Sequence, residues 1–261
     1  NDSKIAPFPM GKVGMPSTSE KGDVTAKAGT LTMTFENDGE KRHLFGRYDN
    51  FCNTKKALEF DVTLTEIPEE SMVIATPFDK PKHFYYNQKI NCMRADGWCR
   101  FDGKEYLFNR ENGSLATLDW GRGVWTYDNT WYWGSGQTVL DDGSTFGWNI
   151  GYGFGNTSAA TENMLFYNGK SHKISEITFN IPMSGKKYLY TEPWTFTSDD
   201  GRFEMTFKPV IDRQAPLDVG VICMIPHQVF GLISGKAVLD DGKVIEINDR
   251  MCFAERVHNK W

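Results

Sequence analysis

Apolar and polar positions alternate with a period of two through much of the chain. Leu31, Met33 and Phe35 alternate with polar neighbours, and the run 58–65 has apolar residues at each of its even positions. Because successive side chains of a strand point to opposite faces, such runs form strands with one apolar and one polar face. No amphipathic helical pattern extends beyond about two turns. We therefore predict an all-β, antiparallel fold.

Asp-Gly and Asn-Gly pairs separate these runs. Both residue types favour the positive φ angles that tight hairpin turns require. The seven pairs begin at residues 38, 96, 102, 142, 168, 200 and 241. So many turns predict an up-and-down meander that closes into two barrels or sandwiches. The clearest hairpin joins residues 194–198 to 203–207, with Phe203, Met205 and Phe207 facing inward.

A polar segment at residues 109–113 marks the predicted domain boundary. We predict an N-terminal arm and a partial first β-barrel in residues 1–112, and a second β-barrel in residues 113–261. The arm is predicted over the first two dozen residues, because they are rich in Pro, Gly, Ser and Lys and show no periodicity.

Composition narrows the possible functions. Hydrophobic residues make up 39% of the 261 residues, which is enough for one large or two small cores. The net charge of -5 and the scattered basic residues argue against nucleic acid. No apolar run approaches the ~20 residues of a membrane span, and no signal pattern opens the chain. The five cysteines form no CxxC pair, which favours reduced thiols and a cytoplasmic location.

The histidines, cysteines and glycines predict neither a metal nor an organic cofactor. The five histidines are isolated, so they lack the spacing of a zinc site. The glycine-rich run 147–155 is not followed by a helical pattern, as a dinucleotide-binding loop would be.

Residues 118–133 are the strongest candidate for a ligand site. They hold four of the eight tryptophans together with a carboxylate and a guanidinium. We predict a wall of stacking rings, although the same indoles could instead cover weak neighbouring strands. The predicted ligand-binding residues of this segment are Trp120, Trp125, Tyr127, Trp131 and Trp133.

Three polar residues are candidates for catalysis. Gly121 and Gly123 would allow a bulge that holds Asp119 and Arg122 over a cavity, or the two could form a structural ion pair. Glu162 shares a strand face with apolar residues, where burial would raise its pKa, unless it is solvated at a barrel mouth. Asp119 and Glu162 are the predicted acid/base pair.

Two further segments contribute predicted ligand-binding residues. Tyr86 and Lys89 lie where polar groups mix with aromatic ones, in a ligand site or in a strand with one solvated face. In residues 147–155 large apolar side chains alternate with four glycines and Asn149, so one face is nearly bare. A bare face admits either a neighbouring indole or a ligand.

Several stretches resemble a bacterial family catalogued as domain of unknown function 2804, and the resemblance covers nearly the whole chain. They are residues 86–93, 118–125, 162–166 with 169–170 and 172–173, 200–207, 227–231 and 254–261. Such proteins are remotely similar to a lipocalin-like, double-barrel group that includes carotenoid hydratases, tocopherol cyclase and decalin-forming cyclases. The resemblance implies a hydrophobic substrate, an acid and aromatic walls, without metal or nucleotide. It carries over no catalytic residue.

Members of this family begin well upstream of the residue that matches Asn1. The resemblance therefore implies that the first barrel is incomplete at its N-terminus. Two alternatives stay open: a second chain or fragment supplies the remaining strands, or the barrel keeps an open edge that invites pairing.

The leading hypothesis is a small-molecule-binding protein with acid/base lyase, hydratase or isomerase activity on a largely apolar substrate in the second barrel. Glu162 or Asp119 would donate a proton, and Arg122 would orient the other carboxylate or a ligand oxygen. A glycoside-active enzyme could use the same two carboxylates at a separation of ~5 to 9.5 Å. A carrier or sensor without catalysis is the third hypothesis, so the sequence leaves open whether the protein is an enzyme.

Overall fold

The fold is all-β and antiparallel, as predicted. The computed structural model describes residues 14–260. Within this range the helical structure is one short 3-10 turn, η1 (Phe51–Asn53), and the recorded strand ladders are antiparallel. Strand β1 (Val24–Ala28) precedes the first predicted strand. The predicted arm falls largely on residues 1–13, which lie outside the described residues.

The chain divides into two compact units. Unit 1 comprises residues up to Pro68 together with Met93–Thr117, and unit 2 comprises Glu69–Cys92 and the chain from Leu118 onward. Glu69–Cys92, which the predicted division assigns to the first domain, is thus part of unit 2. The division into a partial first barrel in residues 1–112 and a second barrel in residues 113–261 stays a prediction.

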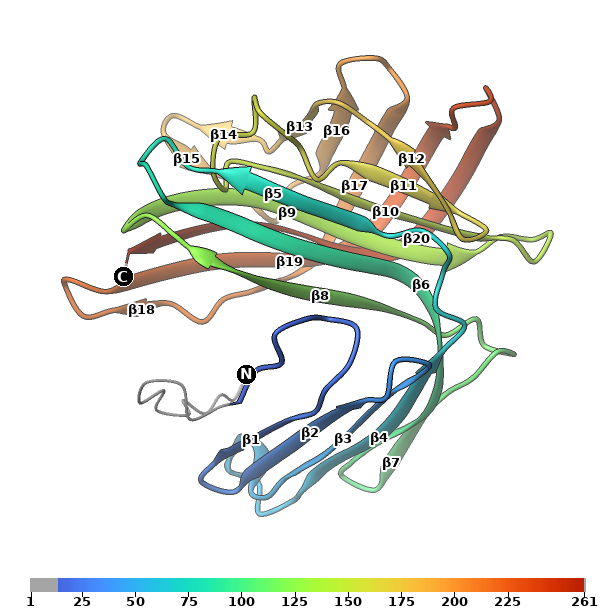
Figure 1. The fold of residues 1–261 in the computed structure, drawn as a ribbon, viewed down its shortest axis with the longest axis vertical. Coiled ribbons are helices and arrows are strands. Elements are labelled where there is room, and N and C mark those ends of the chain that lie inside the picture. The colour runs from blue at the N-terminus through green and yellow to red at the C-terminus, as the bar shows by residue number, and fades with distance from the viewer. Residues whose placement is uncertain (1–13, 261) are drawn as a thin grey trace. The chain divides into compact units, whose positions relative to one another are not determined.

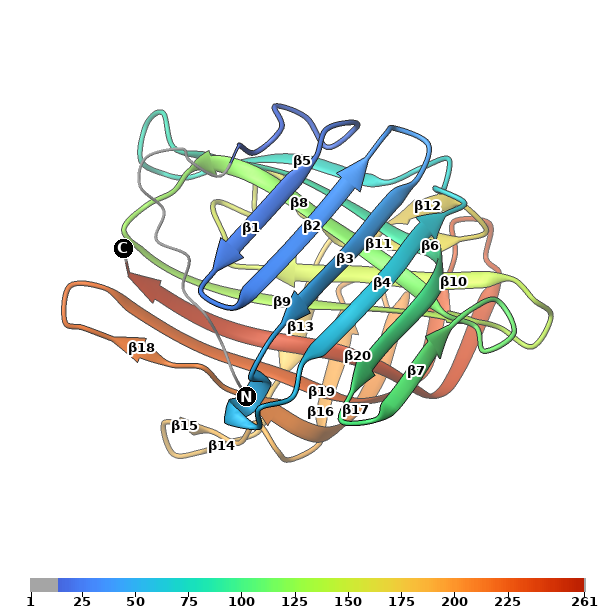
Figure 2. The same cartoon turned by 90° about the horizontal axis from the view of Figure 1, so that it is seen from below.

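Unit 1 is a curled sheet of hairpins. Its strands follow one another in the order β1-β2-β3-β4-β6, and β7 pairs with the last part of β6 (Figure 2). The bounds of the further strands are β2 (Leu31–Asn37), β3 (Arg42–Tyr48), β4 (Leu58–Thr65), β6 (Phe84–Phe101) and β7 (Lys104–Phe108). The predicted strands 31–36 and 58–65 correspond to β2 and β4.

Unit 2 contains a curled ten-stranded sheet (Figure 1). Its order is β12-β11-β10-β9-β20-β19-β17-β16-β13, with β18 paired to β19. The bounds are β9 (Asp128–Val139), β10 (Thr145–Tyr152), β11 (Met164–Tyr167), β12 (Lys170–Lys173), β13 (Ile177–Asn180), β16 (Trp194–Ser198), β17 (Phe203–Arg213), β18 (Leu217–Asp218), β19 (Cys223–Val238) and β20 (Val244–Lys260). A separate hairpin joins β14 (Met183–Ser184) to β15 (Lys187–Tyr188).

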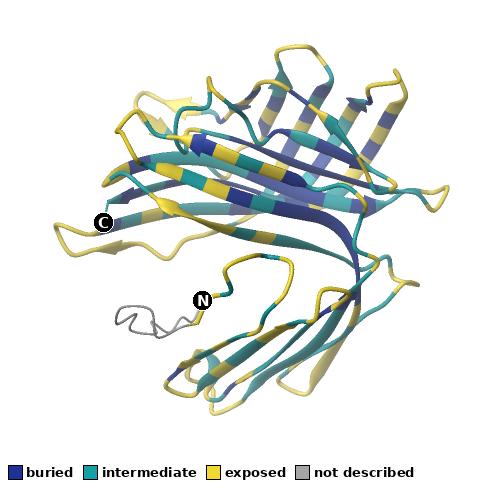
Figure 3. Ribbon diagram, viewed as in Figure 1, coloured by how far each residue is buried: buried dark blue, intermediate teal, exposed yellow. Residues whose placement is uncertain are grey.

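One face of this ten-stranded sheet is packed solid. Trp148 and Ile150 of β10 meet Phe196 of β16 and further large apolar side chains in one core cluster. Phe203, Met205 and Phe207 of the predicted hairpin are buried in it, as expected. Each such side chain contributes roughly 1.5–3 kcal/mol by leaving water. Figure 3 shows the resulting alternation of buried and exposed positions along these strands.

The opposite face of β9, β10 and β20 is covered by three other segments of unit 2. They are β5 (Met72–Pro77), the first part of β6, and β8 (Leu115–Val124) from Leu118 onward. Both β5 and β8 pair with β6. Asn91 of β6 donates a hydrogen bond to Ser135 Oγ of β9 at 3.0 Å, which ties the cover to the sheet.

Six of the seven predicted turns connect consecutive strands. The exception is Asp96-Gly97, which lies inside β6. Gly97 has φ +145°, and a Cβ there would lie 2.1 Å from the carbonyl oxygen of Asp61. This glycine serves the close approach of β4 to β6 and not a turn, a use that the dipeptide alone does not distinguish.

Candidate functional site

A cavity of about 340 Å³ lies in unit 2, between the face of β9 and β20 that carries Trp133 and Glu255 and the cover formed by β6 and β8. The packed core described above occupies the other face of the sheet. We predicted that the ligand lies inside the second barrel. The core cluster fills that space, and the cavity lies on the other face of the sheet. Its lining consists of Tyr85, Lys89, Asp119, Trp125, Trp131, Trp133, Phe154, Met224, Glu162, Glu255 and Asn259.

Lys89 is the central charge of the cavity. Its side chain is only 4% exposed, and its ammonium lies 3.2 Å from Asp119 Oδ2 and 3.5 Å from Glu162 Oε2. The same nitrogen lies 3.5 Å from the centre of the Trp133 ring, a cation–π contact. Asn87 donates a hydrogen bond to Asp119 Oδ1 at 2.7 Å. One buried cation thus holds two carboxylates and an indole together.

A second layer of hydrogen bonds fixes Glu162. The indole N–H of Trp133 donates to Asn149 Oδ1 at 2.7 Å, and the amide of Asn149 donates to Glu162 Oε2 at 3.1 Å. A Cβ at Gly151 would lie 2.8 Å from Glu162 Oε1. The bare glycine face predicted in this segment therefore makes room at Gly151 for the Glu162 carboxylate.

Aromatic rings form the apolar wall. Phe154 lies at its centre, in edge contact with Tyr85, Trp125 and Trp131 at centroid distances of 4.8, 5.5 and 5.2 Å. The alternation of β10 would direct Phe154 into the core, but the strand ends at Tyr152 and the positive φ of the next glycine turns the chain. Phe154 therefore reaches the cavity side.

Glu255 is a third carboxyl group in the lining, and it is 7% exposed. Its Oε1 accepts a hydrogen bond from Trp131 Nε1, and its Oε2 accepts one from Gln228 Nε2, both at 2.9 Å. Burial raises the pKa of Glu255, and the two N–H donors and the charge of Lys89 counteract part of that rise. Burial also raises the pKa of Tyr85, with help from the charges of Asp119 and Glu162.

The structure brings most of the predicted site residues together. The cavity lining includes Asp119, Glu162, Lys89, Trp125, Trp131 and Trp133. Asn149 lies one layer behind, where it links Trp133 to Glu162.

Four predicted residues lie away from the cavity. Arg122 is three residues from Asp119 on β8, so the two point to opposite faces. Its guanidinium lies 5.9 Å from the Trp120 ring, and Trp120 in turn contacts Tyr86. Tyr127 is half exposed and donates to the carbonyl of Val221. Among the described residues, Asp119 pairs with Lys89 and not with Arg122.

Sequence reasoning missed five residues of the lining: Tyr85, Phe154, Met224, Glu255 and Asn259. A signal existed for Tyr85, because it shares the face of Lys89 at a spacing of four on a strand, whereas Tyr86 does not. Glu255 lies opposite Trp133 in the strand register, and Asn259 shares its face. That pairing joins residues more than a hundred positions apart, so no local pattern reveals it.

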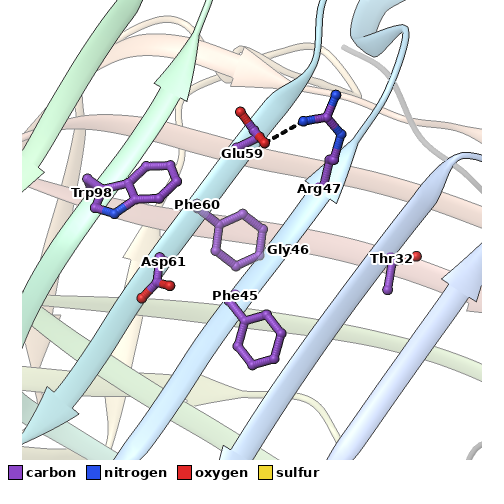
Figure 4. A pocket seen from close by; sticks show the side chains of 8 residues that line it. All are labelled: Thr32, Phe45, Gly46, Arg47, Glu59, Phe60, Asp61 and Trp98. Carbon is purple, nitrogen blue, oxygen red and sulfur yellow. Dashed lines mark hydrogen bonds and ion pairs between the residues drawn. The ribbon is translucent and has the colours of Figure 1, made fainter.

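A second depression, of about 260 Å³, lies on unit 1 (Figure 4). Trp98 and Phe45 stand at its sides, and Arg47 forms an ion pair with Glu59. Asp61 is paired with His43 at 2.9 Å, and hydrogen bonds to Asp61 and Glu36 raise the pKa of His43. Hydrogen bonds to Asp49 and Glu59 raise the pKa of Arg47. The charged side chains of this depression already form ion pairs and are partly exposed to solvent. The unit 2 cavity is therefore the better candidate for a ligand site.

Two further observations concern metals and membranes. Across residues 14–260, no three His, Cys, Asp or Glu side chains gather as a metal ion would require. The same range contains no helix with the length and apolar character of a membrane span. That the protein uses no cofactor stays a prediction.

Comparison with known proteins places this chain in a family. The model of a domain of unknown function, DUF2804, matches residues 1–261. The chain belongs to the DUF2804 family. The predicted resemblance is therefore confirmed. No curated protein matches this DUF2804 chain.

Two solved structures match the DUF2804 chain to different degrees. A crystal structure from Nitrosomonas europaea, provisionally assigned as AttH, matches with a TM-score of 0.52 and 14% identity, over 89% of this chain and 68% of that one. Kievitone hydratase from Nectria haematococca matches with a TM-score of 0.43 and 8% identity, over 92% of this chain and 84% of that one. The first likeness shows a shared fold, in agreement with the predicted two-barrel, lipocalin-like class.

Proposed function

We propose that the protein binds a largely apolar small molecule in the unit 2 cavity and catalyses acid/base chemistry of the lyase, hydratase or isomerase type. The observation that carries this proposal is the placement of three carboxyl groups in two different environments around one aromatic cavity. Glu255 is buried among neutral donors, whereas Asp119 and Glu162 are paired with Lys89. Environments that separate carboxyl groups in this way are how enzymes divide acid and base roles.

The environments assign the roles. Asp119 and Glu162 are ion-paired with Lys89, and in this scheme they accept a proton or stabilise positive charge. Burial favours the protonated form of Glu255, which is therefore the proton donor in this scheme. Asp119, whose side chain is 37% exposed against 17% for Glu162, is the better-placed base for a water molecule. Arg122 has no role in this scheme, because it lies outside the cavity.

For a hydratase, the scheme gives a balanced step. Glu255 protonates one carbon of a C=C bond, and water adds to the other carbon while Asp119 takes its proton. The reverse sequence is dehydration. Isomerisation results when Glu255 protonates one carbon of the C=C bond and Asp119 removes a proton from the carbon next to the other. The aromatic wall of Trp125, Trp131 and Phe154 holds the apolar part of the substrate.

The glycoside alternative is less well supported by this geometry. Glycosidases place two carboxyl groups on either side of the scissile bond. Here Asp119 and Glu162 are both ion-paired with one lysine nitrogen, at 3.2 and 3.5 Å, instead of facing each other across an open space for a sugar.

Proton transfer can be tested before the substrate is identified. The protein is incubated with a cell metabolite extract in deuterated water, and compounds that gain deuterium or water are found by mass spectrometry. Glu255→Gln and Asp119→Asn should each lower the rate of incorporation by about 100-fold or more. Glu162→Gln should reduce it less, and Glu246→Gln, an exposed position on β20, serves as the matched control.

The same experiment separates the enzyme from the carrier. Suppose that a compound binds the unaltered protein and both variants with the same affinity and gains no deuterium even with the unaltered protein. That result would identify a carrier or sensor. Incorporation that is unaffected by both Glu255→Gln and Asp119→Asn would show that the catalytic assignment is wrong.

A further inference from the structure

We propose that the ligand of the unit 2 cavity carries a positively charged N–H group, of the kind found in a protonated alkyl amine. This inference rests on the proposed function only in its assumption that the cavity binds a small molecule. It adds the charge and the hydrogen-bonding character of that molecule, neither of which follows from an apolar wall.

The first observation is the imbalance of charge in the lining. Three carboxyl groups face the cavity, but Lys89 is the one basic side chain among the described lining residues. Its ammonium is engaged by Asp119 and Glu162. These two carboxylates share one cation, so the group carries one negative charge more than its counter-charge. A ligand cation would balance this excess.

The second observation is the arrangement of the rings. Phe154 meets Tyr85, Trp125 and Trp131 at interplanar angles of 83°, 69° and 70°. Trp125, Trp131 and Trp133 also line the cavity, and indole is the aromatic side chain that binds cations best. Lys89 already lies over Trp133 in this cavity, so one ring of the lining binds a cation within the protein itself.

The third observation is an acceptor without a donor. Asn259 lines the cavity and is 1% exposed, yet its Oδ1 has no hydrogen-bond partner among the described residues. A buried amide oxygen left in this way is costly, and in native proteins such groups are nearly always satisfied. An N–H of the ligand would satisfy it, whereas a fully substituted ammonium would not.

These observations argue against the other ligand classes. A neutral hydrocarbon would leave both the excess carboxylate and the Asn259 oxygen unmatched. An anion would face three carboxyl groups across a cavity of about 340 Å³. A protonated amine on an apolar body would pack against the rings, balance the excess carboxylate and donate a hydrogen bond to Asn259 Oδ1.

The test compares two probes of the same shape. N,N-dimethylbenzylamine is protonated at neutral pH and carries one N–H, and isobutylbenzene is its uncharged carbon analogue. Binding is followed at pH 7 by quenching of tryptophan fluorescence and by calorimetry. We expect the amine to bind at least 10-fold more tightly than the hydrocarbon.

Variants assign the preference to named residues. Asp119→Asn should remove most of the preference for the amine, because it removes the carboxylate that exceeds the counter-charge of Lys89, while Glu246→Gln should keep it. Asn259→Leu should weaken the amine more than benzyltrimethylammonium, which has no N–H. Asn259→Ala repeats that comparison if the leucine variant does not fold.

Equal or tighter binding of isobutylbenzene would overturn the inference and leave the proposed apolar ligand site standing. Failure of both probes to bind would also overturn it, and the deuterium experiment would then decide separately whether the proposed function survives. Retention of the full preference by Asp119→Asn would show that the excess carboxylate is not its origin.

Discussion

At the scale of single residues, Gly151 determines where the Glu162 carboxylate lies. Any side chain at this position would place its Cβ 2.8 Å from Glu162 Oε1 and 2.7 Å from the carbonyl oxygen of Tyr132. We expect Gly151→Ala to lower the free energy of unfolding by about 1–3 kcal/mol, because the backbone contact forces a shift. The displaced carboxylate should also weaken probe binding in the cavity. Urea unfolding and fluorescence titration measure the two effects.

Gly134→Ala is the matched control on the neighbouring strand. Its Cβ would meet its nearest atoms at 3.3 Å, so the same substitution should cost less there. A Gly151→Ala variant that is as stable as the original protein, and that binds the probes equally well, would contradict this account of Glu162.

Single residues also show how far the sequence predicts the site. Asp119, Lys89 and the indoles were identifiable because polar groups in an aromatic stretch stand out locally. Arg122 was wrongly placed beside Asp119, since nearness in sequence outweighed the alternation of faces along one strand. Glu255 was out of reach, because it enters the site through the register of β20 on β9, which no single stretch encodes.

At the scale of elements, Lys173 of β12 anchors the segment that carries Glu162. Its ammonium donates hydrogen bonds to Thr161 Oγ1 at 2.6 Å and to the carbonyl oxygen of Asn163 at 2.9 Å. These two residues flank Glu162, so β12 fixes the carboxylate indirectly. Burial lowers the pKa of Lys173 to about 8.

The lowered pKa gives a pH dependence with a definite sign. Between pH 8 and 10.5 the folded state binds fewer protons at Lys173 than the unfolded state, so this residue makes stability rise with pH there. Lys173→Met should cost about 1 kcal/mol at pH 7 through its lost hydrogen bonds. The difference in unfolding free energy between the original protein and the variant should then grow from pH 8 to pH 10. A difference that stays flat or shrinks over this range would contradict the assignment.

Turns and strands were largely predictable, because each is written in a few adjacent residues. Six Asp-Gly and Asn-Gly pairs lie at hairpins. The alternation in 31–36 and 58–65 predicts strands that the structure contains, and in 203–207 it also predicts the buried face correctly. Which face of the ten-stranded sheet holds the cavity was not predictable. Both faces of β9 carry large rings, and only the core cluster shows which of them is filled.

At the scale of the whole molecule, the two units differ in how deeply their strands are buried. β2 has no buried residue, and in β4 only Leu64 is buried, whereas Phe203, Met205 and Phe207 of β17 are all buried (Figure 3). Strands that bury few apolar side chains open at lower free-energy cost. Amide exchange rates measure this local stability. We therefore expect the amides of β2 and β4 to exchange hydrogen at least tenfold faster than those of β17 and β19.

Hydrogen exchange with mass spectrometry makes this comparison on the intact protein, and the probe amine adds a second readout. Because the cavity lining belongs to unit 2, bound amine should slow exchange in β6 around Lys89, in β8 around Asp119 and in β9, while β2 and β4 keep their rates. Equal protection of the two units without ligand would contradict the difference in local stability. Protection that appears in β2 and β4, and not in β8 and β9, would place the amine elsewhere. Exchange rates thus test the stability of each unit and the location of the site in one experiment.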